Sequence, residues 1–414
     1  MNNKSKLEKL FQNWKIECKR SALFDNSVDA KPSNFDFGRI EGMLLGVAIG
    51  DALGVATEGM LPSSRKAEYG EIRDYLPNRY VDETRGFPSD DTQLTFWTLA
   101  QLIEDKGFAP ENVAGKFASS GRIYGIGSTV SRFLRNFKSG MAWEESGPRS
   151  AGNGALMRIA PMLIPHLKSG GPGIWSDTAL SAMMTHNDRV AISSAVTFVG
   201  MLWELLDMSS PPAKEWWVER YVTLARDLEG ETAYRPRSRR VGDYQGPLWR
   251  FVEEKISDAE AKGLSVLDAC NLWYSGAYLL ETVPSALYIL MCYAHDPEEA
   301  IVRAVNDTKD NDTIAAIVGS AVGALHGRKG FPDYWIENLS GRTTDRDDGY
   351  IFELIEQAEY TFWQKLPVIN LDSTQMDSDW IKYVSKDHPL RKPGESNREF
   401  MKRNPIKDYL EGRD

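Results

Sequence analysis

Apolar side chains recur every three or four residues along much of the chain, the spacing that places them on one face of a helix. These stripes predict helices over residues 92–103, 191–205, 283–293, 297–305 and 312–325. Alternation of apolar and polar positions is scarce, and the clearest irregular stretches span residues 71–88 and 234–244. Helices joined by polar loops, without an alternation of strands and helices, predict an all-α fold.

The two ends of the chain differ in pattern from its centre. Four apolar side chains near the N-terminus have helical spacing: Leu7, Leu10, Phe11 and Trp14. A polar stretch with the composition of a linker follows them. We therefore divide the sequence into an N-terminal arm, a main domain and a polar C-terminal extension, over residues 1–37, 38–370 and 371–414. We expect the arm to pack on the main domain; the alternative is an arm that binds a partner.

Glycine recurs every four residues in the first helical stripe of the main domain. Between Ile40 and Ala52 the apolar residues lie on one face, and the glycines are Gly42, Gly46, Gly50 and Gly54. A glycine face has no side chains to hold a neighbour away. The repeat therefore predicts that another helix or a ligand approaches this backbone closely.

Composition narrows the class of protein. The chain has 414 residues and a net charge of −10, which disfavours a protein that coats nucleic acid. Its three cysteines are widely spaced and form no CxxC motif, so no disulfide framework or zinc site is expected. Neither a signal peptide nor a run of about 18 apolar residues is apparent, so we expect a soluble, cytoplasmic protein without membrane contact.

A basic run, RPRSRR at residues 235–240, stands out in this acidic chain. Such runs are usually solvated loops, and that is the expected role here. The alternative is a docking patch for an acidic partner.

Two acidic motifs each precede a predicted helix. The first is Ser89-Asp90-Asp91-Thr92, and the second is Asp310-Asn311-Asp312-Thr313. Either motif alone is explained by N-capping, because short oxygen-bearing side chains accept the free N–H groups of a helix start. Together they hold four carboxylates, which is more than capping needs.

If the two motifs meet in space, their carboxylates must bind protons or cations, because crowded buried charges are costly. An oxygen-only ligand set favours hard cations such as Mg²⁺ or Mn²⁺ over Zn²⁺. An EF-hand is excluded for the second motif, since Ala315 stands where the calcium loop requires glycine.

Four weaker features remain open between structural and functional roles. Glu58 ends the glycine-rich segment and would otherwise be an ordinary surface residue. The polar, glycine-flanked loops at residues 125–129 and 150–158 could present N–H groups to a phosphate, or could simply be turns. His186, in a Thr-His-Asn-Asp segment, is more often a structural than a catalytic histidine in such a context.

Taken in order, these segments resemble the ADP-ribosylglycohydrolase family, which includes the hydrolase that reactivates dinitrogenase reductase and the ADP-ribosylarginine hydrolases. The resemblance covers residues 39–327. Its motifs are GMLLGVAIGDALGVATE ending at Glu58, the acidic motif at Ser89, GNGALMR from Gly152, Thr185-His186, and the acidic motif at Asp310 with its following Ile-Ala-Ala. Five motifs in the family's order are far more specific than one.

The resemblance implies a compact all-α domain with two divalent cations, Mg²⁺ or Mn²⁺, in a central cleft. It implies a metal site formed by Ser89, Asp90, Asp91, Asp310, Asp312 and Thr313. It places Glu58 beside the metals and the ribose. It also implies that ADP-ribose contacts Gly127, Ser128, Asn153, Gly154 and His186, with Tyr278 near the leaving group.

The late acidic motif departs from the family pattern. Thr308 and Lys309 replace its paired glycines, and Asn311 replaces the threonine between the aspartates. The expected ligands Asp310, Asp312 and Thr313 are retained. Metal binding is therefore expected, in a pocket that Lys309 reshapes.

The expected reaction is metal-assisted hydrolysis of the N-glycosidic bond between ADP-ribose and a protein side chain, with arginine as the expected linkage. The cations would bind ribose hydroxyls and lower the pKa of a bound water. Asp91 is the expected residue to take its proton, with Glu58 as the alternative. One alternative is a hydrolase of another ADP-ribose linkage. A second is an immunity protein that neutralises an ADP-ribosyltransferase toxin, binding it through the arm as well as hydrolysing its product. A third is a structural role, which the complete set of acidic residues disfavours.

Overall fold

The computed structural model describes residues 2–77 and 84–363. In those residues every regular element is a helix, and the only strand-like pairings are four isolated bridges. The all-α prediction is therefore confirmed. The predicted C-terminal extension, residues 371–414, lies outside the described residues.

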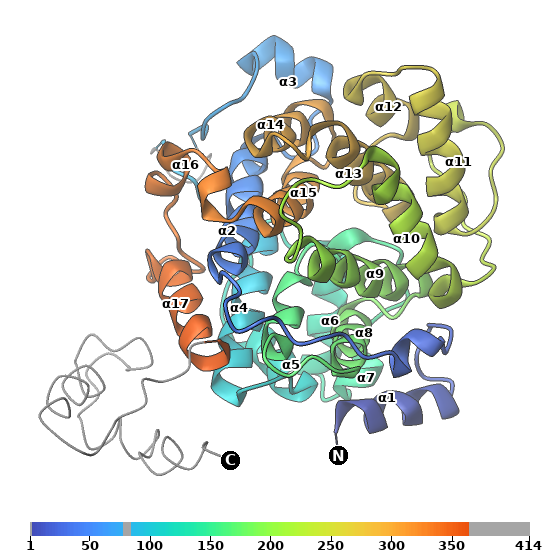
Figure 1. Ribbon diagram of the computed structural model, residues 1–414, viewed down its shortest axis with the longest axis vertical. Coiled ribbons are helices and arrows are strands. Elements are labelled where there is room, and N and C mark those ends of the chain that lie inside the picture. The colour runs from blue at the N-terminus through green and yellow to red at the C-terminus, as the bar shows by residue number, and fades with distance from the viewer. Residues whose placement is uncertain (1, 78–83, 364–414) are drawn as a thin grey trace, which may run out of the picture.

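The helices form a layered bundle around a central pair, α2 and α15 (Figure 1). Their bounds, in chain order, are α1 Asn3–Gln12, α2 Gly38–Gly54, α3 Pro62–Tyr69, α4 Asp90–Asp105, α5 Pro110–Ser119, α6 Ser128–Lys138, α7 Trp143–Ser146, α8 Gly173–Thr185, α9 Arg189–Leu205, α10 Lys214–Glu229, α11 Leu248–Ala261, α12 Val266–Trp273, α13 Leu279–Tyr293, α14 Pro297–Asp307, α15 Asn311–His326, α16 Asp333–Glu337 and α17 Tyr350–Phe362. The six stripes predicted as helices correspond to α2, α4, α9, α13, α14 and α15. In the described part of the stretches predicted to be irregular, residues 71–77, 84–88 and 234–244, the only helical element is one short 3₁₀ turn, Arg239–Val241.

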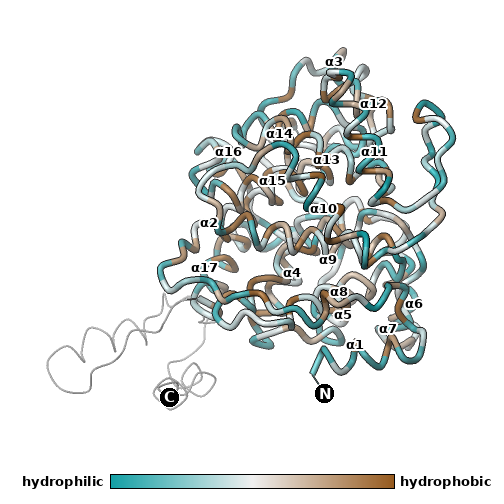
Figure 2. Tube along the Cα trace, turned by 45° about the vertical axis from the view of Figure 1, so that its right-hand side comes forward, coloured by the Kyte–Doolittle hydropathy of each residue, from teal (hydrophilic) through white to brown (hydrophobic). Residues whose placement is uncertain are grey.

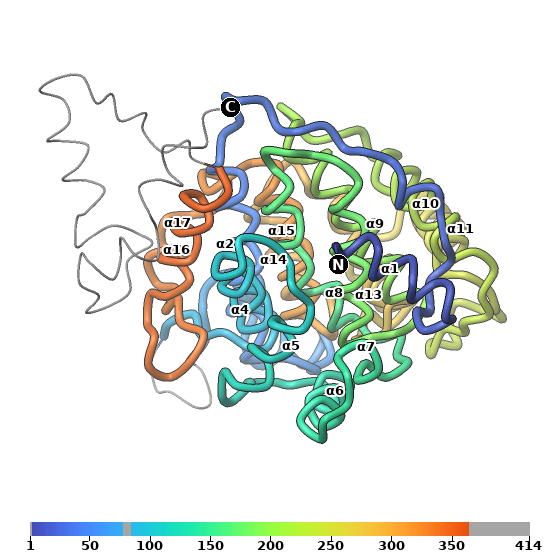
Figure 3. Tube along the Cα trace, turned by 90° about the horizontal axis from the view of Figure 1, so that it is seen from below, coloured from blue at the N-terminus to red at the C-terminus, as the bar shows by residue number. Residues whose placement is uncertain are grey.

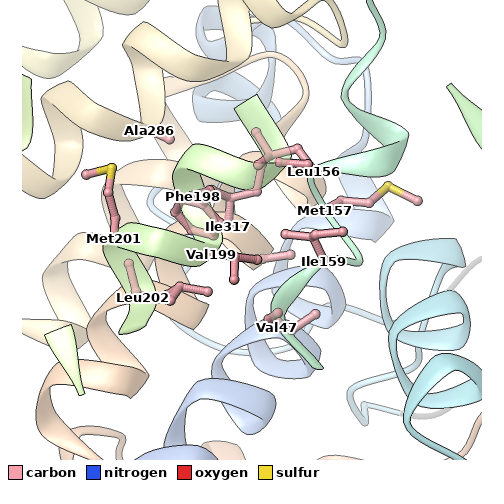
Figure 4. Close-up of a cluster of buried hydrophobic side chains, with 14 of the residues drawn as sticks. Val47, Leu156, Met157, Ile159, Phe198, Val199, Met201, Leu202, Ala286 and Ile317 are labelled. Carbon is pink, nitrogen blue, oxygen red and sulfur yellow. The ribbon is translucent and has the colours of Figure 1, made fainter. Parts of the chain in front are cut away.

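The apolar stripes of these helices meet in one continuous core. Figure 2 shows the hydrophobic parts of the chain concentrated in the interior of the bundle and hydrophilic parts along much of its outside. Near the centre, Val47 of α2, Val199 of α9 and Ile317 of α15 point toward one another, with Ile159 beside them (Figure 4). Each of these four side chains is at least 98% buried, which anchors α2 and α15 within the core.

The glycine repeat of α2 packs directly against α15, and we call this contact the glycine seam. A Cβ atom on Gly46 would lie 2.0 Å from the carbonyl oxygen of Gly319, and one on Gly50 would lie 2.2 Å from that of Ala315. Gly323 meets Gly42 in the same way, with 2.1 Å to its carbonyl oxygen. The predicted close approach is therefore confirmed, and the neighbour is a helix.

Helix α2 and the turn after it, residues 38–57, are long and apolar enough to cross a membrane by length and composition alone. The sequence analysis expected no such segment. Its most apolar window is 83% buried inside the protein, which is the environment of a core helix. The three cysteines are free, as expected.

Residues 2–37 run along the outside of the bundle (Figure 3). Helix α1 packs on α8 with Leu7 and Leu10 buried, and the Asn3 amide donates to Phe108 O at 2.7 Å. Trp14 lies beyond the end of α1 and is 92% exposed, so it is not part of the predicted apolar face. Binding of a partner by the arm stays a prediction.

Farther along the arm, Lys31 is inserted into the main domain. Its ammonium group donates to Trp203 O at 2.6 Å and to Asp207 Oδ2 at 2.7 Å. It also lies 4.2 Å from the centre of the Trp203 ring. The arm is therefore fixed to the domain by a buried charge as well as by α1.

Candidate active site

At one end of the glycine seam, two aspartates lie close together. Asp51 lies in the last turn of α2, and Asp312 is the second residue of α15. A Cβ on Gly54 would lie 2.4 Å from Asp312 Cα, so only glycine allows the two helix ends to meet this closely. The Asn311 amide then ties them together, donating to Gly54 O and Thr57 Oγ1 at 3.0 Å each.

Asp51 also holds the first acidic motif in place. Its Oδ2 accepts hydrogen bonds from the backbone N–H groups of Ser89 at 2.9 Å and Thr92 at 3.0 Å, and from the Thr92 hydroxyl. These bonds satisfy the first turn of α4 from another helix. Ser89 and Asp310 occupy the N-cap positions of α4 and α15, yet neither side chain makes a capping hydrogen bond. The N-capping interpretation is therefore wrong for both side chains.

The carboxylates form two overlapping triads. Oxygen atoms of Asp51, Asp91 and Asp312 lie within 4.8 Å of one another, as do those of Glu58, Asp310 and Asp312. Asp312 belongs to both. The first triad is fully buried, whereas Glu58 is exposed and Asp310 is partly exposed, so the second triad faces solvent. We call the six residues Asp51, Glu58, Asp90, Asp91, Asp310 and Asp312 the acidic cluster.

The carboxylates of the acidic cluster are crowded and mostly buried, which favours the binding of protons or cations. Burial, reinforced by the neighbouring carboxylates, raises the pKa of Asp90, Asp91 and Asp312 well above the usual range. Burial raises the pKa of Asp310 to about 6. Two buried oxygens, Asp51 Oδ1 and Asp91 Oδ1, have no hydrogen-bond partner. Carboxylate oxygens in this arrangement fit divalent, oxygen-preferring cations.

The remaining predicted ligands surround the first triad. Asp91 Oδ2 accepts hydrogen bonds from Thr313 Oγ1 at 3.1 Å and from Ser89 Oγ at 3.4 Å. Asp90 turns toward another segment, where its Oδ2 accepts from the Gly127 N–H at 3.4 Å. All six residues predicted as metal ligands are thus brought to one site.

Residues 125–128 pass over the acidic cluster on the way to α6. Gly125 has φ +70°, and a Cβ there would lie 3.4 Å from Asp90 Oδ1 and 4.0 Å from Glu58 Oε2. Ser128 is the first residue of α6, so the free N–H groups of that helix start beside the carboxylates. This is the geometry in which a helix N-terminus can bind an anion.

The second glycine loop reaches the acidic cluster through Asn153. Its amide donates to Asp310 Oδ2 at 2.6 Å and to Thr282 Oγ1 at 3.1 Å. Its backbone N–H donates to Ala277 O at 3.2 Å, which places the loop alongside Tyr278. The side chain of Tyr278 is half-buried.

His186 lies beneath this loop. A Cβ on Gly154 would lie 2.9 Å from its Cε1 atom, and Nδ1 lies 3.0 Å from Thr185 Oγ1. Arg158 Nη2 donates to the same Thr185 oxygen at 2.8 Å. Burial, with Arg158 nearby, lowers the pKa of His186 to about 3, so the imidazole is neutral at physiological pH.

Sequence reasoning missed two residues that build the site. Asp51 was hidden inside an apolar stripe, although a carboxylate in a buried stripe is itself a signal of function. Arg65 is fully buried, and its guanidinium donates to Thr57 Oγ1 at 2.9 Å and to Thr308 O at 2.7 Å. It thereby joins the turn after α2 to Thr308, two residues before the second acidic motif, and nothing in the sequence pattern indicated this contact.

The chain is similar to known proteins over most of its length. The sequence profile of the ADP-ribosylglycohydrolase family matches residues 32–364. An uncharacterised protein of Archaeoglobus fulgidus is 31% identical over 309 residues, 72% of this chain and 90% of its own. The ADP-ribosylarginine hydrolase Tri1 of Pseudomonas putida (strain GB-1) is 26% identical, covering 73% of this chain and 74% of its own.

A human relative and a solved structure are also similar to this chain over most of its length. The human ADP-ribosylhydrolase ARH3 is 24% identical over 331 residues, covering 73% of this chain and 89% of its own. A solved structure titled ADP-ribosylglycohydrolase-related protein complex superimposes with a TM-score of 0.59 at 26% identity, covering 79% of this chain and 97% of its own. The chain belongs to the ADP-ribosylglycohydrolase family.

Proposed function

We propose that this protein hydrolyses the glycosidic bond between ADP-ribose and a modified protein side chain, with arginine as the linkage. The observation that carries the proposal is the pair of carboxylate triads sharing Asp312, one buried and one open to solvent. The name of the Pseudomonas relative supports the arginine linkage. The name of the human relative leaves the linkage open, so other linkages belong in the same test.

The acidic cluster fits two divalent cations, Mg²⁺ or Mn²⁺. Ser89, Asp90 and Asp91 would hold them from one side, and Asp310, Asp312 and Thr313 from the other. Asp51 would position the first group, since it orders the start of α4. When bound, such cations supply Lewis acidity, which orients ribose hydroxyls and lowers the pKa of a water molecule.

The loops around the acidic cluster would hold the ADP-ribosyl group. Gly127 and Ser128 lie at the start of α6, whose free N–H groups would bind the diphosphate. Asn153 and Gly154 would line the ribose, with the neutral ring of His186 as the floor beneath them. Each group is fixed before substrate arrives, which favours precise orientation of the scissile bond.

Glu58 is our choice for the residue that takes the proton of the attacking water. It is the exposed member of the open triad, and a general base must reach that proton directly or through one water. Asp91 is buried, and its Oδ2 already accepts two hydroxyl groups, so we assign it to the cations. The half-buried Tyr278 would contact the leaving group.

The test is release of ADP-ribose from an arginine-modified protein, with serine-modified protein in parallel. We expect release from arginine that requires Mg²⁺ or Mn²⁺ and that is lost in Asp312→Ala. Release from the serine-modified protein alone would show that the protein acts on the serine linkage instead of the arginine linkage. No release from either, from a folded protein with metal present, would refute the proposed function.

A further inference from the structure

Residues 235–240, which we call the basic loop, join α10 to α11. They carry four arginines in a chain whose net charge is −10. All four are exposed: Arg235, Arg237, Arg239 and Arg240. Within residues 2–77 and 84–363, only Arg237 of these four forms an ion pair. Arg235 bonds to the neutral Gln245. The basic loop therefore presents uncompensated positive charge.

The basic loop is held rigidly. The Nε and Nη2 atoms of Arg237 donate to the two carboxylate oxygens of Glu281 at 2.8 and 2.5 Å, and the Glu281 side chain is fully buried. Ser238 Oγ donates to Leu272 O at 2.7 Å. Arg239 and Arg240 follow within two residues, so their Cα atoms stay within about 8 Å of that of Ser238. Their charges are presented from a fixed base.

The same anchor leads to the acidic cluster. The Arg237 guanidinium lies 5.7 Å from the ring centre of Tyr274 and 5.5 Å from that of Tyr278. The Tyr274 hydroxyl accepts a hydrogen bond from the ammonium group of Lys309, which lies 4.2 Å from the same ring. Lys309 directly precedes Asp310. Positive groups thus continue from the basic loop to the edge of the open triad.

The backbone here is strained in a way that maintains this arrangement. Tyr274 and Ser275 have φ values of +85° and +43°, a region that residues other than glycine rarely adopt. Ser275 O accepts the N–H groups of Lys309 at 3.2 Å and Asp310 at 2.9 Å. The strained pair therefore aims Tyr274 and fixes Lys309 at once, which is typical of functional positions.

We propose that the basic loop and Lys309 form a docking rim for an acidic segment of the modified substrate protein, next to the side chain that carries ADP-ribose. Three of the loop's arginines form no ion pair within the described residues, and Lys309 places the rim next to Asp310 of the open triad. Fixed charges at a rim steer and select partners more than they add affinity. This inference rests on the proposed function and names the substrate class that the site selects.

An acidic protein fits the rim better than a nucleic acid does. One carboxylate, Asp243, follows within three residues of the loop, and the protein as a whole is acidic. A phosphate backbone needs a broad basic track, whereas this patch is local. Binding of an oligonucleotide is therefore an outcome that counts against the proposal.

The experiment compares two synthetic peptides that contain the same ADP-ribosylated arginine, flanked by glutamates in one and by serines in the other. We expect kcat/KM to be about fivefold higher for the glutamate peptide, through KM, at low ionic strength, because two or three exposed ion pairs form. In the variant Arg239→Glu/Arg240→Glu the preference should disappear. The matched control, Lys138→Glu/Lys262→Glu, changes the net charge by the same amount at two exposed sites outside the basic loop and should keep the preference.

ADP-ribosylarginine without flanking residues separates this inference from the proposed function, and all three proteins should cleave it equally. If they do and the peptides show no preference, or the loop variant keeps the preference, the docking rim is refuted. If no protein cleaves it, the arginine linkage fails, and fluorescence anisotropy of a labelled glutamate-rich peptide then tests the rim alone. Loss of peptide binding in the loop variant supports the rim; unchanged binding, or tighter binding of a single-stranded oligonucleotide, overturns it.

Discussion

The contact between α2 and α15 has two regions with opposite properties: the glycine seam along most of its length, and the acidic cluster at one end. Along the glycine seam the backbones touch, no charge is present, and any added atom would collide with a carbonyl group. At the end of the same helix pair, Asp51 and Asp312 bring carboxylates together where burial raises their pKa values. The seam contributes stability through close packing. The acidic cluster costs stability unless a cation is bound, and that cost is typical of a functional site.

The largest effect should come from the acidic cluster. We expect Asp312→Ala to lower turnover on the order of 10³-fold or more, because it removes the carboxylate shared by both triads and with it several kcal/mol of metal-assisted stabilisation. Without metal the variant should unfold at a higher temperature than the wild type, since a crowded buried charge is gone. Thermal unfolding with and without Mn²⁺ measures both effects. A metal-induced shift of the same size in variant and wild type would contradict the assignment.

A substitution in the glycine seam should lower stability, whereas Asp312→Ala should raise the stability of the metal-free protein. Gly50→Ala places a methyl group 2.2 Å from Ala315 O, and two helices must separate to admit it. We expect a loss of about 3 kcal/mol in the free energy of unfolding, measured by urea titration. Gly115→Ala, in helix α5 with no atom within 4 Å of the new Cβ, is the matched control and should gain about 0.5 to 1 kcal/mol. Equal effects of the two substitutions would remove the distinction between seam and surface helix.

The sequence predicts the glycine seam more fully than it predicts the acidic cluster. A glycine every four residues implies close approach whatever the neighbour is, so the seam was predicted without knowing its partner. The identity of that partner is non-local: Gly46 meets Gly319 across more than half of the chain. Hydrophobic periodicity carries no such information.

At the acidic cluster, local reasoning identified the motifs but not what holds them. Capping was the simplest role for Ser89 and Asp310, yet Asp51 from another helix satisfies the start of α4. The ion pair of Arg237 with Glu281 joins the basic loop to helix α13. Such contacts depend on tertiary packing. In the sequence alone, Asp51 belongs to an apolar stripe, Arg237 to a solvated loop and Glu281 to an ordinary helix.

A moderate effect should separate the charge of Asp51 from its hydrogen bonds. Asp51→Asn can keep its carbonyl oxygen toward Ser89 N, Thr92 N and the Thr92 hydroxyl, so α4 should stay in place. It removes the charge that the unpaired Oδ1 presents to the triad. We expect metal affinity, measured as the Mn²⁺ concentration at half-maximal activity, to weaken by about 10- to 100-fold. Unchanged affinity would assign Asp51 a purely structural role.

The smallest expected effect is a pH dependence of stability that comes from His186, beneath the substrate-binding loop. The glycine seam contains no titrating group, so we expect no such pH dependence from it. Burial lowers the pKa of His186 from 6.5 to about 3, so below pH 6.5 the unfolded chain binds a proton that the folded protein refuses. His186 therefore contributes stability that is complete above pH 6.5 and is lost, by at most about 1.4 kcal/mol per pH unit, as the pH falls toward 3.

In His186→Gln the loss of unfolding free energy between pH 7 and pH 5 should be smaller than in the wild type by up to about 2 kcal/mol, since this proton uptake is absent. Urea titrations in the presence of a chelator exclude any contribution from metal binding. Gly46→Ala is the control: it should lower stability equally at both pH values, because its collision with Gly319 O involves no titrating group. If His186→Gln keeps the slope of the wild type, the imidazole is protonated in the folded protein, and its place beneath the Gly152–Gly154 loop would then supply a charge to the ligand.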